Sequence, residues 1–241
     1  MLIKIVGSFL AGLTMCSLVA NAADVPANKN TKSVLPLGQA GLIGSFETLL
    51  DADWHKFRIT KGDHYAVVLV PNTDGRYKQT LIDDLGKTRI TTYGYSADYP
   101  SGYEFTAAAT ADRFVGVKLE RLYDGATLPV SYRLLATKEC DNTVRTNCAA
   151  VVNETKNSTF AWYDDRDWWK VAVKVGQRYR VTLNASMSDR YIDIMTNVGT
   201  YQVGDSRVVD FTAAYTGYYF LNFYAYGGAP GAPYSFVIAP L

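Results

Sequence analysis

The sequence contains the same pattern twice. Asp51–Gly62 (DADWHKFRITKG) recurs as Asp165–Gly176 (DRDWWKVAVKVG), at an offset of 114 residues. The register continues through Tyr65, Val67 and Leu69, which answer to Tyr179, Val181 and Leu183. A second match relates Phe105–Thr110 (FTAAAT) to Phe211–Thr216 (FTAAYT) at an offset of 106, so one loop is shorter in the second copy. A period above 100 residues is too long for a solenoid repeat and predicts a duplicated domain.

The first 23 residues have the pattern of a secretory signal peptide. Lys4 precedes an apolar stretch from Ile5 to Val19, and small residues follow, with cleavage expected after Ala22 or Ala23. The stretch is shorter than the roughly 20 apolar residues of a spanning helix. We therefore expect a secreted or periplasmic protein with no membrane span.

The charges of the chain are balanced. There are 24 Lys and Arg against 23 Asp and Glu, and Lys4 leaves with the signal peptide. No run of like charges occurs, so the sequence carries no electrostatic signal for nucleic acid or for an anionic membrane. We expect neither as a partner.

Two cysteines, Cys140 and Cys148, remain after removal of the signal peptide, and both lie between the two copies. Disulfides form in oxidising compartments, so we expect these two residues to be bonded. A metal pair is disfavoured because His55 and His64 lie far away in the sequence, and a redox pair would have C-x-x-C spacing.

Apolar residues alternate with polar ones on both sides of Gly62 and of Gly176. The alternation predicts two strands joined in an antiparallel hairpin, with His55 and Trp169 at equivalent inward positions. No window shows a helical period. Further strands are predicted at 79–82, 89–93, 103–107, 114–122 and 130–136, and at 191–196, 200–203, 208–212, 217–226 and 234–239. The prediction is an all-β protein of two tandem, jelly-roll-like antiparallel β-sandwiches.

The order of these motifs resembles a known family. The features that carry the resemblance are Asp-x-Asp-Trp-aromatic, a Gly turn, Tyr-x-Val-x-Leu, Phe-Thr-Ala-Ala and, in the second copy, Thr216-Gly217-Tyr218-Tyr219-Phe220. The first copy departs from the last motif at Thr110–Phe114. Together they are similar to the bacterial pre-peptidase C-terminal domain, which is related to the collagen-binding domains of secreted collagenases. The resemblance implies sandwiches at 24–137 and 153–241, with a linker at 138–152, and an accessory or binding function.

Carboxylates cluster where each copy begins its first matched strand. Asp51 and Asp53 lie there in the first copy, and Asp164, Asp165 and Asp167 in the second. Oxygen ligands of this kind suit Ca²⁺, which takes six to eight of them. In calcium-binding relatives the preceding segment completes the site, and here it offers only Gly38-Gln39-Ala40 and Asn153-Glu154. The alternative is that these side chains cap turns and accept backbone hydrogen bonds.

Aromatic residues supply the candidate ligand-binding surface. Trp54 and Trp168 fall on the outward phase of their strands, and they either form a binding platform or cover the edge of the sandwich. A second candidate patch lies near the Gly-rich segment 227–231 and consists of Tyr215, Tyr218, Tyr224 and Tyr226.

The sequence offers little for catalysis. It has no G-x-S-x-G or H-E-x-x-H motif and no Gly-rich phosphate loop, and its two histidines are not placed as a catalytic base. The favoured function is therefore an exported, non-catalytic protein that binds a polysaccharide, peptidoglycan or a fibrous protein through exposed aromatic residues. The alternatives are an accessory or inhibitory partner of a secreted peptidase or hydrolase, and a hydrolase that uses an acid pair.

Overall fold

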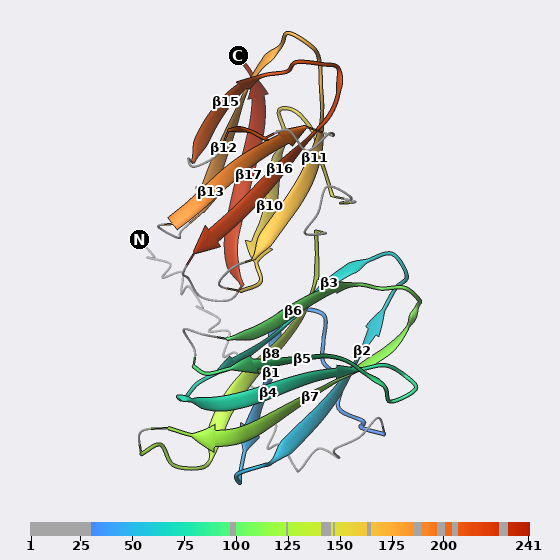
Figure 1. The fold of residues 1–241 in the computed structure, drawn as a ribbon, viewed down its shortest axis with the longest axis vertical. Helices are drawn as coiled ribbons and strands as arrows, with labels where there is room; N and C mark the ends of the chain where they lie inside the picture. Colours follow the sequence, from blue (N-terminus) through green and yellow to red (C-terminus); the bar gives the residue numbers. More distant parts are fainter. Residues whose placement is uncertain are drawn as a thin grey trace, which may run out of the picture.

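A computed structural model of the chain confirms the all-β class (Figure 1). It describes residues 30–96, 100–123, 125–140, 146, 148–162, 165–185, 189–196, 201–203, 207–226 and 231–241. The predicted signal peptide, Asp164 and the side chain of Tyr226 lie outside the described residues. Within the described part, no helix has the length and hydropathy needed to cross a membrane.

Two four-stranded sheets form the first sandwich. The first sheet contains, in spatial order, β1 (Gly38–Phe46), β8 (Val130–Glu139), β3 (His64–Pro71) and β6 (Ser101–Thr106). The second contains β2 (Ala52–Ile59), β7 (Ala111–Leu122), β4 (Gly75–Ile82) and β5 (Thr88–Gly94). All strand pairs within these two sheets are antiparallel, and their inner faces enclose one apolar core.

The second sandwich repeats this plan with one additional short strand. One sheet has the order β10 (Thr155–Phe160), β17 (Ala232–Pro240), β12 (Arg178–Ala185) and β15 (Val208–Thr212). The other has the order β14 (Tyr201–Val203), β13 (Asp189–Thr196), β16 (Gly217–Tyr226), β11 (Arg166–Val173) and β9 (Ala149–Ala150). β9 lies in the segment predicted as a linker and pairs in parallel with β11 at Lys170. The first sandwich has the same contact as an isolated parallel bridge between Val34 and Lys56.

The predicted hairpin is wrong in both copies. β2 and β3 belong to different sheets, as do β11 and β12, so each Gly turn carries the chain across the sandwich instead of joining paired neighbours. The predicted inward faces of these strands are nevertheless correct. Alternation shows which side of a strand meets the core, and strands from either sheet meet the same core.

β1 and β10, the equivalent edge strands, were not predicted. β1 contains three glycines and a register shift between Gly38 and Leu42, and β10 (TKNSTF) ends in its only large apolar residue. Both lack a clear alternation of apolar and polar residues, so the periodicity gave no signal.

Each sandwich contains the same buried hydrogen-bonded chain of three side chains. In the second, Trp169 Nε1 donates to the Tyr234 hydroxyl at 3.0 Å, which donates to Asp167 Oδ2 at 2.6 Å. In the first, His55 Nε2 lies 3.0 Å from the Tyr132 hydroxyl, which donates to Asp53 Oδ2 at 2.7 Å. Since Trp can only donate, the equivalence indicates that His55 is neutral with its proton on Nε2, while its Nδ1 accepts from Ser33 Oγ at 2.7 Å.

His55 makes the first sandwich sensitive to acid. Burial lowers the pKa of His55 to about 4, whereas an unfolded histidine has a pKa near 6.5. The unfolded chain therefore takes up the proton first, and this contribution to stability, complete above pH 6.5, is lost as the pH falls toward 4. The loss is on the order of 3 kcal/mol.

We expect His55→Gln to be less stable than the parent protein at pH 7 but to lose less stability between pH 6.5 and 4. Urea unfolding across this range, with a chelator present throughout, measures the difference. Parallel stability profiles for the two proteins would contradict the assignment.

Candidate functional site between the two sandwiches

The two sandwiches meet on the outer face of β3. Ala66, Val68 and Val70 point away from the core of the first sandwich, yet their exposed fractions are 0%, 1% and 7%. They pack with Leu135 of β8 against Ala161, and Trp162 packs at the edge of this cluster. A Cβ atom on Gly102 of β6 would lie 3.0 Å from the Trp162 ring, so glycine allows the indole to lie on the sheet. We call this contact the junction.

The two copies differ in sequence at the positions that form the junction, and this difference could have predicted it. The positions equivalent to Ala66, Val68 and Val70 in β12 are Arg180, Thr182 and Asn184. Arg180 is exposed, and its guanidinium donates two hydrogen bonds to Asp210. β3 is therefore apolar on both faces, whereas the outer face of β12 is polar. This difference indicates that another part of the protein covers the outer face of the sheet in the first sandwich only.

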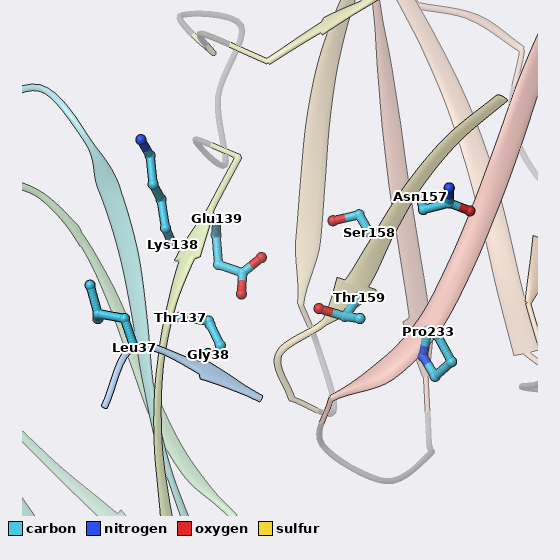
Figure 2. Close-up of a pocket in the computed structure, with 9 residues that line it drawn as sticks. All are labelled: Leu37, Gly38, Thr137, Lys138, Glu139, Asn157, Ser158, Thr159 and Pro233. Carbon is cyan, nitrogen blue, oxygen red and sulfur yellow. The ribbon is translucent and has the colours of Figure 1, made fainter. Parts of the chain in front are cut away.

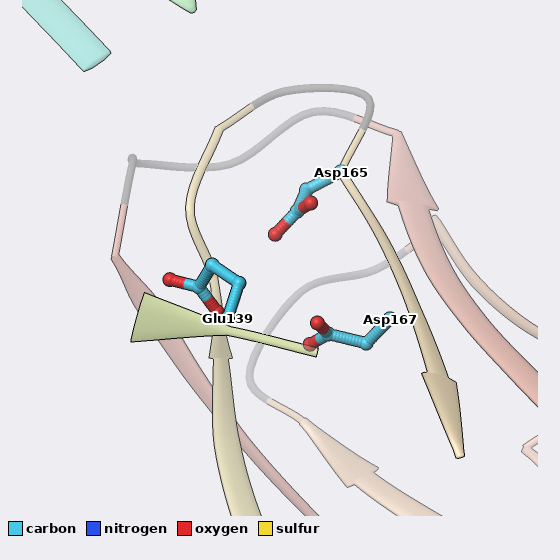
Figure 3. Close-up of side chains that lie close together, drawn as sticks. All are labelled: Glu139, Asp165 and Asp167. Atoms are coloured by element: carbon cyan, nitrogen blue, oxygen red, sulfur yellow. The ribbon is translucent and has the colours of Figure 1, made fainter. Parts of the chain in front are cut away.

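Three carboxylates converge at the acidic end of the junction (Figure 3). Glu139 ends β8, Asp165 immediately precedes β11, and Asp167 lies within β11. One oxygen from each lies within 4.8 Å of the others, and their exposed fractions are 9%, 1% and 0%. We call these three residues the acidic cluster, since both sandwiches contribute to it.

The hydrogen bonds of the acidic cluster leave one buried oxygen without a partner. Asp165 accepts the backbone N–H groups of Ala161 and Arg166. Asp167 Oδ2 accepts from Tyr234, while Asp167 Oδ1 has no hydrogen-bond partner among the described residues. A buried carboxylate oxygen without a partner is unfavourable, so this atom marks a position where a ligand would be stabilising.

The first sandwich adds two polar side chains beside the acidic cluster. His64 pairs in register with Glu139 across β3 and β8, and its Nε2 lies 3.1 Å from Glu104 Oε2 of β6. Glu104 in turn hydrogen-bonds the side chain of Asp165. Two carboxyls in contact share a hydrogen bond only when one of them holds a proton. Because His64 pairs with Glu139, which precedes Cys140, it lies near Cys140 in space although the two are distant in sequence.

The pKa values of the cluster reflect its crowding. Burial, reinforced by the charge of Asp165, raises the pKa of Glu139 to about 8. Burial and the contact with Glu104 raise the pKa of Asp165 well above its usual range. Burial and the charges of Asp165 and Glu139 do the same for Asp167. At neutral pH the cluster without a cation therefore retains protons.

A cavity of about 610 Å³ lies between the sandwiches next to the cluster (Figure 2). Its wall combines the end of β8 with the start of β1 on one side and β10 with Pro233 of β17 on the other. The lining residues are Leu37, Gly38, Thr137, Lys138, Glu139, Asn157, Ser158, Thr159 and Pro233. Glu139 thus belongs both to the cavity wall and to the acidic cluster.

The predicted disulfide between Cys140 and Cys148 is present, with an S–S distance of 2.06 Å. Cys140 directly follows Glu139, and the backbone carbonyl of Cys148 accepts from Lys170 N in β11. The disulfide therefore ties the end of the first sandwich to the edge of the second, within one residue of the acidic cluster.

The equivalent carboxylates of the first sandwich, Asp51 and Asp53, accept hydrogen bonds from other groups of the protein. Asp51 Oδ2 accepts the backbone N–H of Glu47, as Asp165 does from Ala161, and Asp53 accepts from Tyr132. Among the described residues, no third His, Cys, Asp or Glu joins these two in a cluster. Glu104 and Glu139, which the sequence-based prediction missed, distinguish the second site.

The predicted aromatic residues occupy different environments. Trp54 is half-buried and lies across Gly116, where a Cβ atom would be 2.7 Å from the indole. Trp168 is half-buried opposite Asn222, and Tyr224 stacks on Tyr191 with ring centroids 5.2 Å apart. Tyr218 is 54% exposed, and Tyr215 packs against Tyr219 at 4.9 Å.

Comparison with known proteins does not assign a function. No family model matches the chain, and no curated protein matches it. Among solved structures, the CUB1-EGF-CUB2 region of human MASP-1/3 has 7% identity and a TM-score of 0.23, with 82% of this chain and 99% of that one covered. The PBSX exported protein XepA has 9% identity and a TM-score of 0.27, with 90% and 98% covered. Tripeptidyl peptidase 2 has 8% identity and a TM-score of 0.29, with 86% and 24% covered. These scores are too low to support an inference.

Trp162 provides a test of the junction. We expect Trp162→Ala to lower the free energy of unfolding by about 2 kcal/mol, because a half-buried indole is lost from an apolar contact. Small-angle scattering should show a larger radius of gyration as the sandwiches separate. Trp54→Ala, which removes an indole away from the junction, is the matched control; equal radii in all three proteins would contradict the proposed contact.

Proposed function

We propose that the chain is an exported, non-catalytic binding protein that engages a polysaccharide, peptidoglycan or a fibrous protein through aromatic side chains, with Ca²⁺ bound at the junction. The observation that carries the proposal is the aromatic surface of the second sandwich. Trp168, Tyr218 and Tyr224 all lie on the solvent side of the sheet formed by β11, β16 and β13. Aromatic rings on a solvent-facing sheet offer large, rigid contact areas to a ligand.

The residues at the junction fit a calcium ion. All three members of the acidic cluster are oxygen donors, which a hard cation prefers, and both oxygens of a carboxylate can coordinate. The unpartnered Asp167 Oδ1 would coordinate the cation, which would also replace the protons that the crowded carboxylates otherwise retain. Calcium would then tie Glu139, from the first sandwich, to Asp165 and Asp167, from the second.

The polymer-binding proposal is tested by retention on immobilised or insoluble polymers. We expect the purified protein to be retained on at least one member of a panel of polysaccharides, peptidoglycan and collagen, and to be released by the soluble form of the same polymer. Bovine serum albumin is the control for non-specific adsorption. If no member of the panel retains the protein, the proposal is contradicted.

The calcium proposal is tested by thermal unfolding after chelation. A ligand that binds only the folded state at 100 times its Kd adds about 2.7 kcal/mol, which we expect to raise the Tm by roughly 5–10 °C. The shift should vanish in the double variant Glu139→Gln/Asp167→Asn. It should persist in Asp53→Asn, the matched change in the first sandwich. An equal calcium shift in the parent protein and the double variant would show that the ion binds elsewhere.

A further inference from the structure

We propose that the cavity between the two sandwiches binds an extended peptide of another protein, which adds to the second sandwich as a strand beside β10. This site goes beyond the proposed function, since it uses the free edge of a sheet and not aromatic side chains. We call the cavity the edge slot. One wall is formed by Asn157, Ser158 and Thr159 of β10, and the opposite wall includes Thr137, Lys138 and Glu139 of β8 (Figure 2).

The edge slot is open to solvent. Among the residues that line it, only Glu139 is buried, whereas Lys138, Asn157 and Pro233 are exposed. Its volume of about 610 Å³ lies within the range of roughly 300–1,000 Å³ that is typical of ligand sites. A ligand can therefore enter the slot without a rearrangement of either core.

Each wall of the edge slot is the edge of a strand. Successive side chains of a strand point to opposite faces of its sheet, so a cavity that touches three successive residues meets the strand edge-on. Both walls touch the slot in this way, at residues 157–159 and 137–139. β10 is an outermost strand of its sheet, and the pairing of β1 with β8 extends only as far as Ala136. Two strand edges, one from each sandwich, therefore border the slot.

The backbone of β10 offers donors and acceptors to the slot. The carbonyl of Phe160 accepts a hydrogen bond of 2.8 Å from Gly231 N, which precedes β17, so the polar backbone groups of Phe160 face β17. These directions alternate along a strand of an antiparallel sheet. The N–H and C=O groups of Asn157 and Thr159 therefore point away from β17, toward the edge. No other described strand pairs with this edge.

The edge of β10 lacks the features that usually prevent strand pairing. Proteins protect such edges with proline, with charged side chains or with bulges. β10 contains no proline, and its register with β17 is unbroken along its whole length. Its single charged residue, Lys156, forms an ion pair of 2.9 Å with Glu154 and does not line the slot. The equivalent edge strand β1 has a register shift in its first half. β10 is thus the better suited of the two to accept another strand.

The side chains of the slot select for a peptide without acidic residues. Thr137, Ser158 and Thr159 are small, so a peptide backbone can approach β10 closely. The ammonium of Lys138 is engaged by Asp63 at 2.9 Å, whereas Glu139 belongs to the acidic cluster. An acidic peptide residue beside Glu139 would add to the crowding of carboxylates, and a lysine or arginine would relieve it. In strand addition, backbone hydrogen bonds supply affinity and such side-chain contacts supply specificity.

The test begins with selection of linear peptides from a phage-displayed library on the folded protein in the presence of calcium. Enriched peptides are then titrated by fluorescence anisotropy. We expect Asn157→Pro, which removes an N–H group from the free edge and leaves the bonds to β17 in place, to weaken binding about tenfold. Asn157→Ala, which keeps this N–H group, is the matched control and should bind like the parent protein. Circular dichroism melts check that both variants are folded.

Amide hydrogen exchange of the parent protein, followed by NMR, gives a second measurement that needs no variant. We expect a bound peptide to slow exchange at Asn157 and Thr159, while Lys156 and Ser158, whose amides face β17, change little.

Three outcomes would overturn the inference. The first is that no displayed peptide binds, or that bound peptides leave exchange at Asn157 and Thr159 unchanged. The second is equal weakening by Asn157→Pro and Asn157→Ala, which would assign the contact to the side chain. The third is enrichment of acidic peptides, which would contradict the ligand class. Retention on polymers, the test of the proposed function, is independent of these results.

Discussion

The outer face of β3 constrains the whole arrangement, because it is apolar and cannot be left in water without cost. Ala66, Val68 and Val70 alternate with core residues on the same strand, so one strand must be covered on both sides. Its own sandwich covers one side, and Ala161 with Trp162 covers the other. Burial of apolar surface contributes about 25 cal/mol per Å², so this contact favours the docked arrangement of the two linked domains.

The position of the apolar contact determines where the carboxylates meet. Trp162 and Asp165 lie on the same connection between β10 and β11, while His64 begins β3 and pairs with Glu139 at the end of β8. Docking the apolar surfaces therefore brings acidic groups of both sandwiches into one buried region. Burial of several carboxylates is costly unless protons or a cation offset their charge. The junction thus joins an apolar contact, which needs no ligand, to an acidic one that a cation would complete.

The sequence predicted the scaffold well because duplication provided two readings of each strand. The shared alternation gave the inward faces correctly, and the exchange of His55 for Trp169 was recognised as a change inside the core. It did not reveal which strands pair, because the two sheets present the same alternation to a common core. It also missed Glu104 and Glu139, since neither belongs to the repeated motif and both reach Asp165 only through the junction. The acidic contacts between the copies leave no trace in the repeated motif, unlike the apolar outer face of β3.

The differences between the copies are therefore the better guide to function. Equivalent positions that kept their role, such as Tyr132 and Tyr234 beneath their aspartates, maintain the fold in both sandwiches. Two outer faces also differ between the copies: β3 is apolar where β12 is polar, and β16 carries Tyr224 and Asn222 where β7 carries Lys118 and Gly116. The first difference buries a surface between the sandwiches, and the second places half-buried aromatic side chains on the outer face of the second sandwich. Divergence of this kind accounts for docking through the first copy, and the proposed binding function draws on the second.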